Sequence, residues 1–128
     1  MDLQLQHVEI HVSSLKEAKD FYVTKLGLEL LEERQELNLI ALRAGGVRLS
    51  IFGGYERTLP SNKATGTHII FRTGNLEETI NTLKKRGIIF KGEIFEAPGF
   101  IRDIATEDPD GNVIEIAQYL RDPLKSQA

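Results

Sequence analysis

One local pattern occurs twice in the chain, and it limits the available folds more than any other feature does. The stretches LQHVEIHVSSLKEA (residues 5–18) and THIIFRTGNLEETI (residues 67–80) each hold a histidine, a strand-like run, a polar turn and the start of a helix. His7 and His68 occupy the same place in the two copies. Two copies with a period of about 60 residues predict a duplicated module and not a solenoid, which needs three or more repeats.

Each copy predicts the same order of elements, a strand, a helix and three further strands. A helix is expected after Ser14 and another after Asn75, because each of these residues is a good N-cap with a glutamate three positions later. Gly27 and Gly87 are expected to end the two helices. The later strands are expected near Leu28–Glu32, Leu37–Arg43, Val47–Phe52, Ile88–Ile94, Phe100–Thr106 and Asn112–Tyr119.

The chain of 128 residues predicts a single α+β domain over residues 1–128. Module one is expected at about 3–52 and module two at about 67–120, with a polar, turn-rich linker or active-site loop at 53–66. The net charge is −3 with scattered basic residues, and no apolar run approaches the ~18 residues of a membrane span, so neither nucleic acid nor membrane is an expected partner. The absence of cysteine excludes a thiolate site or nucleophile, and the lack of an export signal predicts a cytoplasmic protein.

Strand alternation predicts where the polar side chains of the two modules point. His7, Glu9 and His11 share one face of the first strand, and the apolar face opposite suits contact with a helix. His68 and Glu115 are likewise expected on the faces that the helices leave uncovered. Any one of these residues alone is an ordinary polar group on a solvated strand. Two imidazoles and a carboxylate together form a ligand set suited to Fe, Mn, Ni, Co or Zn, so one divalent metal is expected if His7, His68 and Glu115 meet in space.

The chain resembles the vicinal oxygen chelate superfamily, which includes glyoxalase I, methylmalonyl-CoA epimerase, extradiol dioxygenases, fosfomycin-resistance transferases and bleomycin-resistance proteins. The resemblance rests on the paired β-α-β-β-β modules, the opening HVEIHVSSLKEAKDFYVTKLGLEL and the closing DPDGNVIEIAQ. It implies two tandem modules that form a cupped mixed sheet around a metal, which binds two neighbouring oxygens of a small-molecule substrate. It also implies a homodimer.

The resemblance assigns His7, His68 and Glu115 as the metal ligands. It places Ser50 where glyoxalase I and the epimerases usually carry Glu or Gln, so three protein ligands remain, as in the dioxygenases and the fosfomycin enzymes. Both of those groups differ from this chain as well. Ala105 stands where the extradiol dioxygenases carry a tyrosine, and GEIFEAPGFIRD lacks the serine-rich potassium loop of the fosfomycin enzymes.

Further candidates for the site share the strand faces of the ligands. Glu115, His11 and Glu9 are candidates for catalysis, because His11 could act as a general base and Glu9 could orient a substrate or accept a proton. A plain solvated role is the alternative for both His11 and Glu9. The candidates for substrate binding are Ser50, Phe52, Arg48, Arg72 and Tyr119, with the arginines suited to an anionic group.

Two classes of function remain open from the sequence. The resemblance implies a divalent-metal-dependent lyase, transferase or dioxygenase acting on a molecule with two vicinal oxygens, with room for a thiol co-substrate. The alternative is a metal-free protein that sequesters a drug or metabolite, as the bleomycin-resistance proteins do. We favour the enzyme, because a sequestering protein has no need to keep the set of His7, His68 and Glu115.

Overall fold

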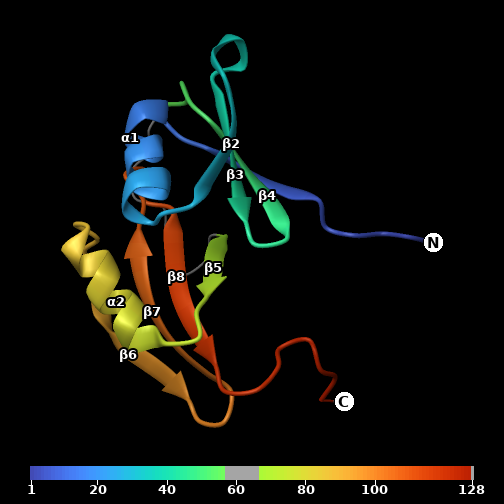
Figure 1. Ribbon diagram of the computed structural model, residues 1–128, viewed down its shortest axis with the longest axis vertical. Coiled ribbons are helices and arrows are strands. Elements are labelled where there is room, and N and C mark those ends of the chain that lie inside the picture. Colours follow the sequence, from blue (N-terminus) through green and yellow to red (C-terminus); the bar gives the residue numbers. More distant parts are fainter. Residues whose placement is uncertain (57–66, 128) are drawn as a thin grey trace. The chain divides into compact units, whose positions relative to one another are not determined.

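The computed structural model describes residues 1–56 and 67–127. It divides into two compact units, Met1–Ser61 and Asn62–Ala128. Each unit has the predicted order of strand, helix and three strands around one mixed four-stranded sheet (Figure 1), which confirms the α+β class and the duplicated module. Most of the predicted linker over residues 53–66 lies outside the described residues.

The sheet of the first unit has the strand order β1-β4-β3-β2. Its first strand pairs in parallel with its last, and the other neighbouring strands are antiparallel. The elements of the first unit are β1 (His7–His11), α1 (Leu15–Lys19), β2 (Glu29–Arg34), β3 (Leu39–Ala44) and β4 (Val47–Phe52).

The predicted strand Leu37–Arg43 begins two residues too early. Gln35–Leu37 form a turn of 3₁₀-helix, and Asn38 follows in the left-handed conformation at φ 53°. This tight turn reverses the chain between β2 and β3, so the extended conformation starts only after it. Asparagine tolerates this region better than most residues do, which explains its position here.

The first helix starts as predicted and then departs from the expected form. The Ser14 hydroxyl accepts a hydrogen bond from the Glu17 N–H at 3.1 Å, as a capping residue should. After Lys19 the chain continues as a π-helix over Asp20–Lys25, in which the Leu26 N–H donates to the carbonyl of Phe21 five residues back. The spacing of apolar residues predicts a helix here, but it does not distinguish the two hydrogen-bonding patterns.

The sheet of the second unit repeats this topology in the order β5-β8-β7-β6. The predicted strand Ile88–Ile94 is wrong at its start: Gly87 adopts φ 94°, and the Ile88 N–H caps the helix by donating to the Leu83 carbonyl. The elements of the second unit are β5 (His68–Arg72), α2 (Leu76–Lys85), β6 (Lys91–Ala97), β7 (Ile101–Glu107) and β8 (Val113–Tyr119).

Helix α2 packs on one face of the second sheet (Figure 1). Its buried residues Leu76, Ile80 and Leu83 form the core of this unit together with buried residues of β8, such as Ile114. Gln118 extends from β8 and accepts the Leu76 N–H at 2.9 Å, which ties the start of the helix to the strand. The opposite face of this sheet is therefore left to other side chains.

Candidate functional site

In the second unit, the parallel pairing of β5 with β8 brings two predicted ligands together. The register sets Ile70 opposite Glu115, so Glu115 lies diagonally across from His68 on the same face. His68 Nδ1 and Glu115 Oε2 are 2.9 Å apart, a hydrogen bond between side chains that are 32% and 17% exposed. A nitrogen and a carboxylate oxygen at this separation are suitable donors for one divalent metal.

A second carboxyl group, that of Asp103, interacts with Glu115 and was not among the candidates predicted from the sequence. Asp103 on β7 pairs with Ala117 on β8, and Ala105 pairs with Glu115. Asp103 and Glu115 therefore lie on the same face of the sheet, in neighbouring pairs of that face. Burial raises the pKa of Asp103, and the negative charge of Glu115 and a hydrogen bond with it raise that pKa further. Strand alternation could have placed Asp103 on this face, but only the register of β7 with β8 shows that it reaches Glu115.

In the first unit, β1 and β4 pair in parallel and place six of the predicted residues on one face. The register sets His7 opposite Arg48, Glu9 opposite Ser50 and His11 opposite Phe52. The alternating exposure of β1 agrees with this placement, because His7, Glu9 and His11 are exposed while the residues between them are half-buried. Sequence alternation thus predicted which residues share a face within each strand. The register of the structure adds which residues of the two strands stand opposite one another.

Glu9 and His11 form a pair at the carboxyl end of β1. Glu9 Oε2 lies 2.7 Å from His11 Nε2. The imidazole of His11 also stacks on Tyr55, with ring centroids 4.1 Å apart and planes 3° from parallel, and meets the edge of Phe52 at 6.1 Å. Tyr55 was not a sequence candidate, since it follows β4 in the stretch predicted to be a loop. We call His11, Phe52 and Tyr55 the aromatic cluster.

Arg48 and Ser50 are already engaged with each other. Arg48 Nε donates to Ser50 Oγ at 3.2 Å, and its Nη2 donates to Glu32 Oε2, also at 3.2 Å. Hydrogen bonds from Arg34 and Arg48 hold the pKa of Glu32 below its usual range. Arg48 therefore has a carboxylate partner within its own unit. Ser50 is 4% exposed, and its hydroxyl lies on the same face as Glu9.

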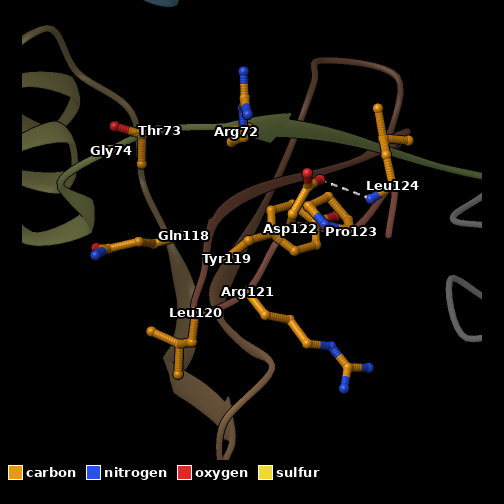
Figure 2. Close-up of a pocket in the computed structure, with 10 residues that line it drawn as sticks. All are labelled: Arg72, Thr73, Gly74, Gln118, Tyr119, Leu120, Arg121, Asp122, Pro123 and Leu124. Atoms are coloured by element: carbon orange, nitrogen blue, oxygen red, sulfur yellow. Dashed lines mark hydrogen bonds between the residues drawn. The ribbon is translucent and has the colours of Figure 1, made fainter. Parts of the chain in front are cut away.

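The two remaining candidates, Arg72 and Tyr119, line a cavity at the carboxyl ends of β5 and β8 (Figure 2). His7 belongs to the first unit and the pair of His68 and Glu115 to the second, so their meeting around one metal stays a prediction. Over residues 1–56 and 67–127, no group of three or more His, Asp or Glu side chains that could hold a metal ion is present. Nor does any helix in that part of the chain have the length and apolar character needed to cross a membrane.

Known proteins resemble this chain over most of its length. A sequence model of the Glyoxalase/Bleomycin resistance protein/Dioxygenase superfamily matches residues 4–116. The catechol-2,3-dioxygenase of Bacillus subtilis (strain 168) is 29% identical over 94 residues, which is 67% of this chain but 33% of the dioxygenase, so the match spans about a third of that protein.

Solved structures agree in fold. A glyoxalase family protein from Enterococcus faecalis is 30% identical with a TM-score of 0.71, and the alignment covers 89% of this chain and 96% of that one. TnmS3, an antibiotic-binding protein from Streptomyces sp. CB03234, is 24% identical with a TM-score of 0.73, and the alignment covers 92% and 97% of the two chains.

Proposed function

Because the chain belongs to the Glyoxalase/Bleomycin resistance protein/Dioxygenase superfamily, we propose that it is a metal-dependent enzyme acting on a small molecule. His7, His68 and Glu115 would hold one divalent ion, Fe, Mn, Ni, Co or Zn, and the substrate would bind through two vicinal oxygens. The observation that supports this most is the distance of 2.9 Å between His68 Nδ1 and Glu115 Oε2, the side chains of two of the three proposed ligands. The bound metal would supply Lewis-acid polarisation of the substrate oxygens.

The side chains of the chain itself limit how protons would move in this site. Ser50 cannot exchange a proton at neutral pH, because the pKa of its hydroxyl is far too high, and its oxygen already accepts from Arg48. Glu9 and His11 form a hydrogen-bonded pair that could take a proton from a substrate and hold it. Glu115 is the other candidate. A lyase, transferase or dioxygenase reaction, with or without a thiol co-substrate, is compatible with these groups.

Metal analysis of the purified protein tests the ligand set. The native protein should hold about one divalent ion per completed site. Glu115→Gln should lose most of it, because an amide keeps the shape and a hydrogen bond to His68 but is a much weaker ligand. Glu93→Gln is the control, since Glu93 lies on the exposed strand β6 of the same unit. Equal metal content in native protein and Glu115→Gln contradicts the ligand assignment.

Ser50 provides a test of reaction type. With three protein ligands, an octahedral metal keeps three positions for water and substrate. We expect weak or absent glutathione-dependent glyoxalase activity and measurable metal-dependent binding of a bidentate oxygen ligand such as a catechol. Ser50→Glu should tighten metal binding by adding an anionic oxygen, with Ser50→Gln as the uncharged control. Efficient turnover of the methylglyoxal–glutathione adduct by the native protein would refute this interpretation.

We also propose a cytoplasmic homodimer, and mixed dimers can show how its sites are built. His7→Ala and Glu115→Ala chains are mixed and assayed for metal binding. If each site combines modules from two chains, both lesions of a mixed dimer can fall in one site and leave the other intact. If each site is built within one chain, mixing restores no metal binding.

A metal-free binding protein is the second candidate, and the aromatic cluster favours it. His11 stacked on Tyr55 and edged by Phe52 is a surface on which a planar ring could bind. Under this alternative, the protein should bind a planar aromatic antibiotic equally well with and without EDTA. Tyr55→Leu should then weaken binding while Glu115→Gln leaves it unchanged, whereas the metal-dependent enzyme predicts loss of substrate binding on chelation and in Glu115→Gln.

A further inference from the structure

The cavity at the carboxyl ends of β5 and β8 has a volume of about 760 Å³. It lies entirely within the second unit, between the ends of these strands and residues 120–124 (Figure 2). Its volume falls in the range of roughly 300–1,000 Å³ that is usual for small-molecule sites. Arg72 is four residues beyond His68 on β5, and Tyr119 is four residues beyond Glu115 on β8, so the cavity is about 13 Å along these strands from that pair. None of the residues that line it is a proposed metal ligand.

Apolar side chains form one part of the wall, beside its polar groups. Tyr119 ends β8, and Leu120, Pro123 and Leu124 follow it along the cavity. Leu120 is 42% exposed and Leu124 is 92% exposed, so apolar area lies open to water at this position. A ligand with an apolar body would cover that area and be stabilised in proportion to the area removed from water.

The charged groups of the wall leave an excess of positive charge. Arg72 and Arg121 both line the cavity, and in the described part of the chain neither forms an ion pair with a carboxylate. Asp122 is the acidic residue of the wall, but its Oδ1 accepts the Leu124 N–H at 2.9 Å and so holds the turn that follows β8. One negative and two positive groups favour an anionic ligand.

The two arginines differ in how freely they can serve a ligand. The guanidinium of Arg121 lies over the Phe100 ring at 4.7 Å and donates to Gln127 Oε1 at 3.4 Å. The Arg72 side chain forms no hydrogen bond or ion pair with residues 1–56 or 67–127, so its guanidinium donors are open toward that part of the chain. Figure 2 shows the two side chains extending in different directions, which argues against a clamp made of both.

Two backbone amides at the nearby start of α2 already have acceptors within the unit. The Leu76 N–H is bonded to Gln118, and the Glu78 N–H is bonded to Asn75. Because these capping bonds occupy two of the amides at the start of the helix, a guanidinium with its planar fork is the better match for a ligand anion, and a carboxylate fits that fork with two parallel hydrogen bonds.

We propose that this cavity binds a small amphipathic carboxylic acid, with Arg72 holding the carboxylate and the residues after β8 covering the apolar body. The site needs no metal and does not depend on the proposed enzymatic function. Binding is therefore measured in the presence of EDTA, so that failure of the metal assignment and failure of this proposal are separate results.

The probe is 2-naphthoate, and 2-naphthalenemethanol is its uncharged match. A ¹H–¹⁵N NMR titration of the native protein should show saturable shifts at the amides of Gly74 and Leu124 with naphthoate and much weaker binding of the alcohol. Arg72→Gln should weaken naphthoate binding about tenfold, as expected for loss of a charge-assisted pair. Arg43→Gln should leave it unchanged, because Arg43 is an exposed arginine of the first unit that pairs with Glu29.

Three results would each overturn the proposal. The first is the absence of saturable shifts at these amides up to millimolar naphthoate. The second is equal affinity of the native protein for the acid and the alcohol, a comparison that needs no variant. The third is native affinity in Arg72→Gln.

Discussion

Asp108 organises the turn between β7 and β8, and its replacement by alanine should destabilise the second unit strongly. Its Oδ1 accepts the backbone N–H groups of Asp110 at 2.9 Å and Asn112 at 2.8 Å, and its Oδ2 accepts Asn112 Nδ2 at 2.8 Å. The residue is 4% exposed, so water cannot readily take its place. The strand that follows this turn carries Glu115, and the turn therefore sets where that carboxylate stands.

The expected loss can be worked from these three bonds. A hydrogen bond to a charged group contributes about 1.5–3 kcal/mol, and a buried donor left without an acceptor costs about 1–3 kcal/mol. The three bonds share one carboxylate and are not additive, so we expect Asp108→Ala to lower the free energy of unfolding by about 3 kcal/mol. Asp108→Asn should lose only about 1 kcal/mol, since the amide oxygen can still accept both backbone N–H groups.

Urea denaturation followed by circular dichroism measures both variants. The midpoint should fall with an unchanged slope, because the area exposed on unfolding stays the same. Asp20→Ala is the control: Asp20 is an exposed aspartate 3.7 Å from Lys25, and its loss should change stability by no more than about 0.5 kcal/mol. If Asp108→Ala costs less than about 1 kcal/mol, or no more than Asp108→Asn, the bonds to the carboxylate do not hold the turn.

Two further predictions concern close packing and a half-buried carboxyl group. Gly53→Ala should destabilise the first unit by about 1–3 kcal/mol, because a Cβ there would lie 2.9 Å from Leu15 Cβ and 3.1 Å from the Leu15 N. Gly46→Ala is the control in the same urea assay and should cost far less, because a Cβ at Gly46 meets open space. Asp103→Asn should stabilise the protein at neutral pH. Burial and the charge of Glu115 raise the pKa of Asp103 in the folded protein. The free energy of unfolding is therefore unaffected by this group below its ordinary pKa, and it decreases as the pH rises from there through the raised pKa. The gain should vanish near about pH 3, and an equal gain at both pH values would refute this explanation.

Local chemistry made much of the fold predictable. Ser14 and Asn75 accept the N–H of the residue three positions later in the structure, because capping depends on neighbours in sequence. The π-helix at Asp20–Lys25 was not predictable in the same way. A change from one helical hydrogen-bonding pattern to another leaves the apolar spacing of the sequence almost unaltered, so that spacing carries no signal for the π-helix.

For the candidate site, strand alternation was the only sequence signal that could predict where side chains point. Alternation identified which residues share a face within one strand, such as His7, Glu9 and His11. It does not tell which strands are neighbours, and Asp103 was missed for that reason. Tyr55 was missed because it lies beyond the end of a strand, where no periodicity applies, and its ring is positioned by contact with His11.

The registers of the two sheets show how the copies of the module have diverged. Glu9 stands opposite Ser50 in the first sheet, and Ile70 stands opposite Glu115 in the second, so Ser50 and Glu115 hold equivalent places. The first copy thus has a carboxylate (Glu9) on its first strand and a hydroxyl (Ser50) on its last. The second copy has an apolar side chain (Ile70) on its first strand and a carboxylate (Glu115) on its last. A carboxylate introduced at position 50 would stand beside Glu9, and two anions on adjacent strands repel unless a cation lies between them. A serine at this position therefore places no second anion opposite Glu9, whose carboxylate is hydrogen-bonded to His11.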